Sequence, residues 1–413
     1  MSWAMRNDQK SRIARLEALV DRVCDTYVTN GPLPHLQLLL SVDGEVILDH
    51  CQGQACADGG SLQGSALYRL ASMSKPIVIA AALVLVEEGR LALDMPVAEP
   101  MPEFSRQRLW TGEVDEEGKL ITIPCDGAMT ILDLMRHTAG LTYSIHGATA
   151  LDRFYAEHYL DSFHQRRNSD DYAAALAEAP LLYRPGERFH YSASVDLLGI
   201  VIERVSGMSL DHFLDQAIFA PLGMVDSFFM VPPDRIDRLT DAWMVERPGA
   251  APTLYDRGGH SRWRMPQKSW SGGGGLVSSA RDYHRFLSML MEGGVFEGRR
   301  ILSQESVTRM MTNQLPSGGD LVAEGASPVS ETAPEGVGMG LGGAVLLDPA
   351  RAEIPGSKGT WFWGGLLSTG FFLDPVRRVI GIVMTQLMPP DTTRLREDFR
   401  RGVEEIMRED GNG

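Results

Sequence analysis

Cysteine is scarce in this chain, and the few cysteines present do not follow a metal-binding spacing. The sequence contains four of them, Cys24, Cys51, Cys56 and Cys125. Cys51 and Cys56 are too far apart for a CxxC pair, and the chain has no HExxH or paired histidine and carboxylate spacing. We therefore expect free, partly buried thiols, a reducing compartment, and neither a metal nor another cofactor.

Long apolar runs are also missing. The longest uncharged apolar stretch, residues 76–86, is too short to span a bilayer and predicts a buried helix. Residues 1–15 are polar and charged, without the apolar segment of a secretion signal. The net charge of −15 argues against nucleic acid or an anionic membrane as a partner. These features predict a soluble, cytoplasmic protein that acts on a small molecule, and they leave the oligomeric state open.

Lysine is scarce as well, which makes the position of Lys75 informative. It is one of only five lysines, and it stands three residues after Ser72 at the start of the apolar run. If a helix begins near Ser72, the two side chains share one face and the amine can reach the hydroxyl. This is the SxxK arrangement of acyl-serine enzymes, in which the lysine can accept the serine proton. Because SxxK also arises by chance, other segments have to support it.

Two further segments provide that support. Residues 184–193 read RPGERFHYSA and place Tyr191 after a proline-glycine turn and just before a helix, where a phenol could shuttle protons. Residues 360–370 read TWFWGGLLSTG, an expected strand whose consecutive glycines let a ligand approach the backbone. Taken separately, Tyr191 could be a buried aromatic with a satisfied hydroxyl, and the glycine segment could be ordinary packing.

The periodicity of apolar residues predicts an α/β (α+β) fold. Strand patterns occur at both chain ends, at residues 35–41, 45–50, 359–363, 367–373 and 379–385. Helical patterns occupy residues 10–28, 76–86, 130–136, 171–179, 194–205 and 393–408. We predict an antiparallel sheet flanked by helices and built from residues 1–95 and 271–413. A mainly helical lobe, residues 96–270, is inserted between them, and residues 315–337 form a long surface loop.

These segments together resemble one family. SMSK at residues 72–75, Tyr191 with Ser192, and Trp363-Gly364-Gly365 are similar to the serine β-lactamase-like superfamily, specifically the family VIII carboxylesterases related to class C β-lactamases. Further matching segments occur in the family's order: MPEF at 101–104, TILDLMRHTAGL at 130–141, PLGMVDSF at 221–228 and SGGGGLVSS at 271–279. The resemblance covers most of residues 65–385 and implies a β-lactamase/DD-peptidase-like fold.

The resemblance also implies roles for individual residues. Ser72 would be the nucleophile, with Lys75 and Tyr191 sharing the duties of general base and acid. The backbone N–H groups of Ser72 and Leu366 would form the oxyanion hole. The implied substrate-binding residues are Tyr143, Trp363, Gly364 and Gly365.

Two positions depart from the β-lactamase pattern. Ala193 stands where an asparagine usually follows the tyrosine by two residues, and Trp363-Gly364-Gly365 replaces a Lys-Thr-Gly triplet. The triplet Lys358-Gly359-Thr360 lies upstream but out of register with the following segment. Since the carboxamide and the second lysine are missing, the sequence favours neutral, apolar esters over anionic antibiotics.

We therefore expect a serine hydrolase that cleaves small carboxylic esters through an acyl-enzyme intermediate on Ser72. A peptidase or amide hydrolase of D-amino-acid or linear peptides, or an acyltransferase, is possible on the same fold. A non-catalytic binding protein is the alternative of another class. The chain has no GxSxG pentapeptide of an α/β-hydrolase, and residues 272–275 lack the ending of a phosphate loop. His137, His146 and His190 are expected to be structural and hydrogen-bonded.

Overall fold

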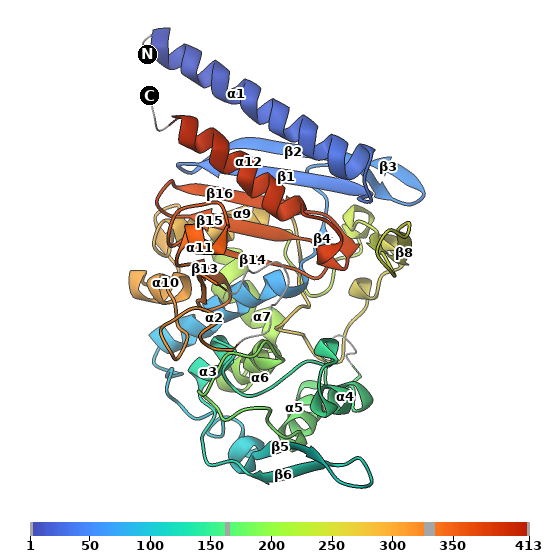
Figure 1. Ribbon diagram of the computed structural model, residues 1–413, viewed down its shortest axis with the longest axis vertical. Helices are drawn as coiled ribbons and strands as arrows, with labels where there is room; N and C mark the ends of the chain where they lie inside the picture. Colours follow the sequence, from blue (N-terminus) through green and yellow to red (C-terminus); the bar gives the residue numbers. More distant parts are fainter. Residues whose placement is uncertain (1–2, 162–165, 326–334, 411–413) are drawn as a thin grey trace.

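The strand patterns at the two chain ends form one sheet in the computed structural model, which describes residues 3–161, 166–325 and 335–410 (Figure 1). Its eight antiparallel strands are, in spatial order, β12 (Val337–Met339), β13 (Ala344–Leu346), β14 (Trp361–Gly364), β15 (Gly370–Asp374), β16 (Val379–Met384), β1 (His35–Val42), β2 (Glu45–Cys56) and β3 (Gly59–Ser61). β1 pairs with β2 on one side and with β16 on the other. The predicted fold class, with a sheet built from both chain ends, is confirmed.

Helices cover both faces of this sheet because its central strands β1, β15 and β16 are buried on both sides. The N-terminal helix α1 (Trp3–Cys24) and the C-terminal helix α12 (Leu395–Asp410) pack against each other and over one face (Figure 1). On that face Leu38 and Leu40 of β1 share a core with Phe399. Leu39 points to the opposite face, as strand alternation requires, and joins the larger core there. That larger core includes α2 (Ser74–Glu87) and α9 (Ala280–Met291).

The inserted part of the chain forms a lobe beside the sheet (Figure 1). Its principal helices are α3 (Ile131–Met135), α4 (Ala150–Glu157), α5 (Ser169–Glu178) and α6 (Ser194–Ser206). Thr130 caps α3 through a capping box with Asp133, and Asn168 caps α5. α6 packs against both α2 and α3, so the apolar helix α2 connects the lobe to the sheet.

The predicted mainly helical lobe at residues 96–270 also contains strands. β5 (Arg108–Val114) pairs with β6 (Leu120–Pro124), and β7 (Ala242–Met244) pairs with β8 (Thr253–Asp256). β7 also pairs in parallel with β17 (Leu387–Met388) near the C-terminus. The first hairpin is hard to recognise because apolar side chains on it, including those of Ile121 and Ile123, are exposed rather than turned to a core. The domain boundaries at residues 95 and 270 stay a prediction.

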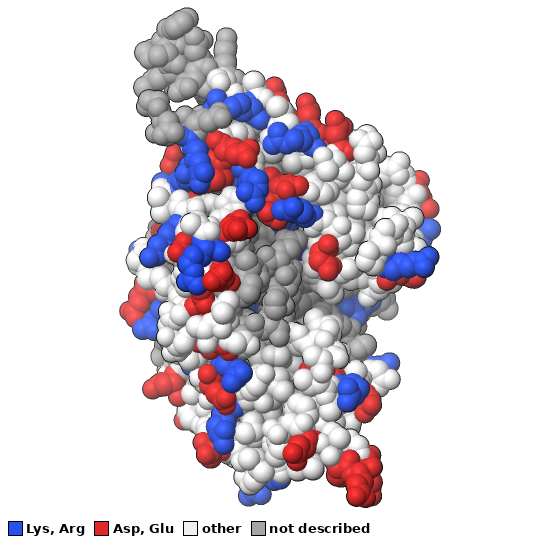
Figure 2. All heavy atoms as spheres, viewed as in Figure 1, with Lys and Arg blue, Asp and Glu red and all other residues white. Residues whose placement is uncertain are grey.

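Several expectations from composition can be compared with the structure. All four cysteines are free thiols, as predicted. Within the described ranges no helix has the length and apolar character needed to cross a membrane. Acidic and basic side chains are interspersed on the face shown in Figure 2, most densely over the part formed by the sheet and α12. Of the predicted surface loop at residues 315–337, residues 326–334 lie outside the described residues.

The contact between α1 and α12 generates a stability prediction. A methyl group on Gly402 would lie 2.2 Å from Cδ1 of Leu19, a side chain that is 1% exposed. Alanine gains about 1 kcal/mol over glycine in helix propensity, but overpacking a filled core costs about 1–3 kcal/mol. We expect Gly402→Ala to lower the free energy of unfolding in urea. In the double variant with Leu19→Ala the two losses should be less than additive, and full additivity would contradict the close contact.

Candidate active site

Ser72 lies on a tight turn between a short strand and the apolar helix. β4 (Tyr68–Arg69) ends just before it, the 3₁₀ turn Ala71–Met73 contains it, and α2 begins at Ser74. The sequence predicted that the helix would begin near Ser72, so the α-helix starts two residues late. Pro76 explains the difference, because it has no N–H to donate to the Ser72 carbonyl and the first turn tightens.

The backbone just before Ser72 is strained. Ala71 has a φ of 46°, in the left-handed region that a residue with a Cβ seldom occupies. Leu70 is fixed on both sides, because its N–H donates to Leu276 O (2.9 Å) and its carbonyl accepts from Thr369 Oγ1 (3.3 Å). Strain of about 1–3 kcal/mol at one residue persists only where such neighbours enforce it.

The structure brings the three predicted catalytic residues together. Tyr191 OH donates to Ser72 Oγ at 2.8 Å, and Lys75 Nζ donates to the same oxygen at 3.3 Å. Lys75 Nζ lies 4.6 Å from the ring centroid of Tyr191. Lys75 and Tyr191 are both buried, and Tyr191 stands in the turn that precedes α6. The amine and the phenol therefore converge on one hydroxyl, as the spacing of SMSK and the position of Tyr191 predict.

A buried carboxylate that the sequence analysis did not identify organises this group. Asp196 Oδ1 accepts from Gly273 N (2.9 Å) and from Ser271 Oγ (2.7 Å), while Oδ2 accepts from Tyr143 OH (2.7 Å). Gly273 O in turn accepts from Lys75 Nζ at 2.7 Å. A methyl group on Gly273 would lie 2.4 Å from Asp196 Oδ2, so this position requires glycine. The only sequence signal was the position of Asp196 in the first turn of the helix after Tyr191.

Tyr143 lines the site, and its hydroxyl donates to Asp196 rather than to Ser72. Its ring centroid lies 5.6 Å from Lys75 Nζ and 5.7 Å from the Tyr191 ring. Burial, reinforced by the Asp196 carboxylate, raises the pKa of its phenol well above the ordinary value. The hydroxyl therefore stays protonated and bonded to Asp196.

The three histidines are hydrogen-bonded, and His146 also lines the cavity at Ser72, so their purely structural role stays a prediction. The His137 Nδ1 and Ser192 Oγ atoms are 3.3 Å apart, and His146 Nε2 lies 2.8 Å from the Tyr191 carbonyl. His190 Nε2 lies 2.9 Å from Thr142 Oγ1. Burial lowers the pKa of His137 well below its usual value, and the nearby Lys75 lowers it further. His137 is therefore neutral at neutral pH and supports the ring of Tyr191, 4.7 Å away between centroids.

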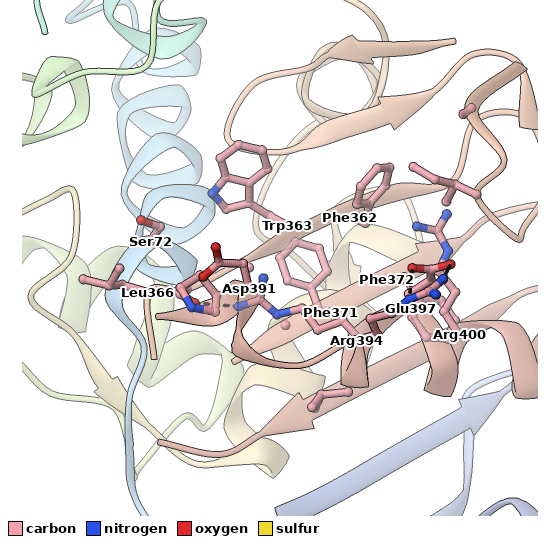
Figure 3. Close-up of a pocket in the computed structure, with 18 of the residues that line it drawn as sticks. Ser72, Phe362, Trp363, Leu366, Phe371, Phe372, Asp391, Arg394, Glu397 and Arg400 are labelled. Carbon is pink, nitrogen blue, oxygen red and sulfur yellow. Dashed lines mark hydrogen bonds and ion pairs between the residues drawn. The ribbon is translucent and has the colours of Figure 1, made fainter. Parts of the chain in front are cut away.

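A cavity of about 780 Å³ opens onto Ser72 and extends along β14 toward α12 (Figure 3). Trp363 and Tyr143 line it together with Tyr191, and the rings of Trp363 and Tyr191 are 5.6 Å apart between centroids. In Figure 3 the indole of Trp363 points toward Ser72, whereas Arg394 and Arg400 lie at the far end. Trp363 thus lines the cavity, but its side chain is only 8% exposed and also belongs to the larger core, so its role in substrate binding stays a prediction.

The two glycines after Trp363 allow the backbone to approach the serine. Gly365 N donates to Thr369 O at 2.8 Å, so residues 365–369 form a turn in place of the first part of the predicted strand at 367–373. A methyl group on Gly365 would lie 2.3 Å from Leu70 O. Leu366 follows on this turn and lies beside Ser72 (Figure 3). Within the described part of the chain its N–H has no protein acceptor, as an oxyanion donor requires.

The structure also shows the surroundings of Ala193 and Lys358, two residues considered in the comparison with the β-lactamase pattern. Ala193 is fully buried at the start of α6 and contributes no polar group to the site. Lys358 is exposed on the turn before β14, which agrees with excluding it from the site. Within the described ranges, no cluster of three or more His, Cys, Asp or Glu side chains could hold a metal ion.

A serine bonded to a lysine and a tyrosine, set between an antiparallel sheet and a helical lobe, is the arrangement of a serine hydrolase. The pattern of the beta-lactamase family matches residues 20–404, and the chain belongs to this family. The resemblance to the family VIII carboxylesterases is confirmed.

Three relatives illustrate the range of the family. The chain is 32% identical over 385 residues to an uncharacterised protein of Mycobacterium tuberculosis, covering 90% of each chain. It is 33% identical over 387 residues to esterase EstB of Burkholderia gladioli, covering 89% of each. The solved structure of EstCE1, a hydrolase with promiscuous acyltransferase activity, is 26% identical with a TM-score of 0.78, covering 95% of this chain and 99% of that one.

The position of Trp363 generates a second prediction. Removing an indole that contacts the substrate should raise KM for apolar esters roughly tenfold, because burying a large apolar side chain is worth about 1.5–3 kcal/mol. We expect Trp363→Ala to have this effect with a modest change in melting temperature. Trp361→Ala is the matched control, since Trp361 is fully buried in the same strand and packs on Phe371. Trp361→Ala should lower the melting temperature and leave KM unchanged. If Trp363→Ala gave that same result, Trp363 would belong to the core.

Proposed function

We propose that the protein is a serine hydrolase that cleaves small carboxylic esters through an acyl-enzyme intermediate on Ser72. The observation that carries this proposal is the convergence of Lys75 Nζ and Tyr191 OH on Ser72 Oγ at the cavity. A serine hydroxyl is a weak nucleophile, and an adjacent base makes it competent to attack a carbonyl carbon.

The geometry supports a two-step reaction. Ser72 Oγ attacks the ester carbonyl while its proton passes to the Lys75–Tyr191 pair, and the Ser72 and Leu366 N–H groups stabilise the oxyanion. The pair then protonates the departing alkoxide, which leaves an ester between the acyl group and Ser72. Water repeats the sequence and releases the carboxylic acid. Since the two side chains are coupled through one hydroxyl, either can take the first proton.

Two positions beside Ser72 support neutral esters as the substrate class, although charged side chains, among them Arg396, also line the cavity. The indole of Trp363 occupies the place of the lysine in the β-lactamase triplet, and Ala193 occupies that of the carboxamide. Neither can bind the carboxylate or the amide of a β-lactam. The likeness to esterase EstB points in the same direction.

Acyl transfer to an alcohol is the second candidate. The cavity is large enough for an alcohol beside the acyl group, and the related EstCE1 is described as a hydrolase with promiscuous acyltransferase activity. Peptide or amide hydrolysis has no such support, and a non-catalytic binding protein would not need the Ser72, Lys75 and Tyr191 arrangement. The cytoplasmic location stays a prediction.

The catalytic assignment makes a third prediction. Ser72→Ala should abolish acylation, and Lys75→Ala and Tyr191→Phe should each lower kcat by about 10² to 10⁴ with the fold intact. The losses should not add in the double variant, because the two groups act on one proton. Fluorophosphonate labelling with mass spectrometry locates the adduct. Lys358→Ala, on an exposed turn, is the matched control with unchanged kcat, and near wild-type activity in Lys75→Ala would refute the assignment.

The substrate class makes a fourth prediction. In a panel of p-nitrophenyl esters of increasing acyl length, a cephalosporin and D-alanyl peptides, we expect the esters to have the highest kcat/KM. Addition of a primary alcohol to the best ester should divert part of the product to the new ester if acyl transfer also occurs. A peptide that exceeded every ester by orders of magnitude would contradict the proposed class.

A further inference from the structure

Arg396 of α12 makes a charged hydrogen bond to the turn that carries Leu366. Its Nη2 atom donates to the carbonyl oxygen of Gly365 at 2.6 Å. The same oxygen also accepts from Ser368 N at 3.1 Å, within the turn itself. The Arg396 side chain is partly buried, and Arg394, the residue just before α12, bonds to Glu397 of this helix. Arg396 is therefore directed at the backbone beside the site.

The carbonyl of Gly365 and the N–H of Leu366 belong to the same peptide unit. Among the described residues the only cis peptide is Met388–Pro389, so this unit is trans and its C=O and N–H point in opposite directions. A guanidinium bonded to the oxygen draws electron density through the conjugated amide and makes the N–H a stronger donor. It also fixes the plane of the peptide, so the direction of the N–H is set before substrate binds.

We propose that Arg396 is a positioning residue that orients and polarises the Leu366 N–H for the oxyanion of the ester reaction. This inference rests on the proposed function, since it assigns Leu366 to the oxyanion hole. The effect would be selective for the transition state, because the oxyanion carries more negative charge than the substrate carbonyl. Arg396 would thus support kcat rather than substrate binding.

The glycines of this segment give the arginine its access. A methyl group on Gly364 would lie 2.4 Å from Arg396 Nη1, and one on Gly370 would lie 2.9 Å from its Cδ. Gly364 and Gly370 face each other across β14 and β15. The guanidinium therefore lies over two adjacent glycines and could not approach Gly365 O past larger side chains. The missing side chain at Gly364 accordingly leaves room for Arg396, whereas the missing side chain at Gly365 permits the close contact with Leu70.

Polarisation can be measured directly by NMR. Labelling glycine at the carbonyl carbon with ¹³C and leucine with ¹⁵N leaves a bonded ¹³C–¹⁵N pair only at Gly–Leu steps, and the chain has four of them. Leu366→Met identifies the Leu366 signal by its disappearance. In Arg396→Met we expect this signal to move upfield, and in Arg396→Lys it should recover partly. The other Gly–Leu signals and the spectrum of Arg408→Met, a surface control on α12, should remain as in the wild type.

Kinetics and infrared spectroscopy test the consequence for catalysis. Deleting an oxyanion donor costs about 10² to 10³ in kcat, and weakening one should cost less, roughly tenfold, with KM within about twofold. The carbonyl stretch of the acyl-enzyme should shift to higher wavenumber in Arg396→Met. Gly364→Ala displaces the guanidinium without removing it and should reproduce these effects. This variant replaces Arg396→Met in the test if Arg396→Met does not fold.

Two results would overturn the inference. One is an unchanged Leu366 signal in the folded Arg396 or Gly364 variants. The other is a loss of kcat without a shift of the acyl carbonyl stretch, which would indicate a general structural role. The absence of an acyl adduct on Ser72 in the wild type would refute the proposed function instead, and the Leu366 signal reports on Arg396 in either case.

Discussion

The hydrogen bond from Lys75 Nζ to the carbonyl of Gly273 connects the three parts of the molecule that form the site. An amine buried to 1% exposure needs partners, because an unsatisfied polar group in the interior costs several kilocalories per mole. Gly273 can be that partner only where Asp196 holds its N–H, and Asp196 stands on the lobe helix that follows Tyr191. The hydrogen bonds of one amine thus join α2 to the glycine segment and, through Asp196, to the lobe.

The same constraint explains why small residues accumulate around Ser72. Backbone atoms provide the acceptor for Lys75 and the candidate oxyanion donor at Leu366, so the main chain has to come close to the serine in two places. A Cβ at Gly273 would collide with Asp196, and one at Gly365 would collide with Leu70 O. Glycine at these positions is a steric requirement of the site, independent of any need for flexibility.

The parts of the site that could be predicted from the sequence depend on local geometry. Ser72 and Lys75 lie within one helical turn, so the pair can be recognised without knowing the tertiary fold. The apolar run after them indicates a buried helix. Asp196 and Arg396 could not be found in this way, because each acts on a backbone atom far away in sequence, 77 residues from Asp196 and 31 from Arg396. Neither the β5–β6 hairpin nor the 3₁₀ turn at Ser72 follows from apolar periodicity, since the first is exposed and the second depends on Pro76.

The C-terminal helix links the stability of the sheet to the geometry of the site. α12 packs on α1 through Gly402 and on the sheet through Phe399, and the same helix carries Arg396 to the turn after β14. A rigid helix seated by a buried apolar face can place a guanidinium with the precision that a peptide N–H requires, whereas a side chain on a free loop would lose that orientation to conformational entropy. The predicted sheet built from both chain ends therefore has a functional consequence: the last helix of the chain supports the backbone opposite Ser72.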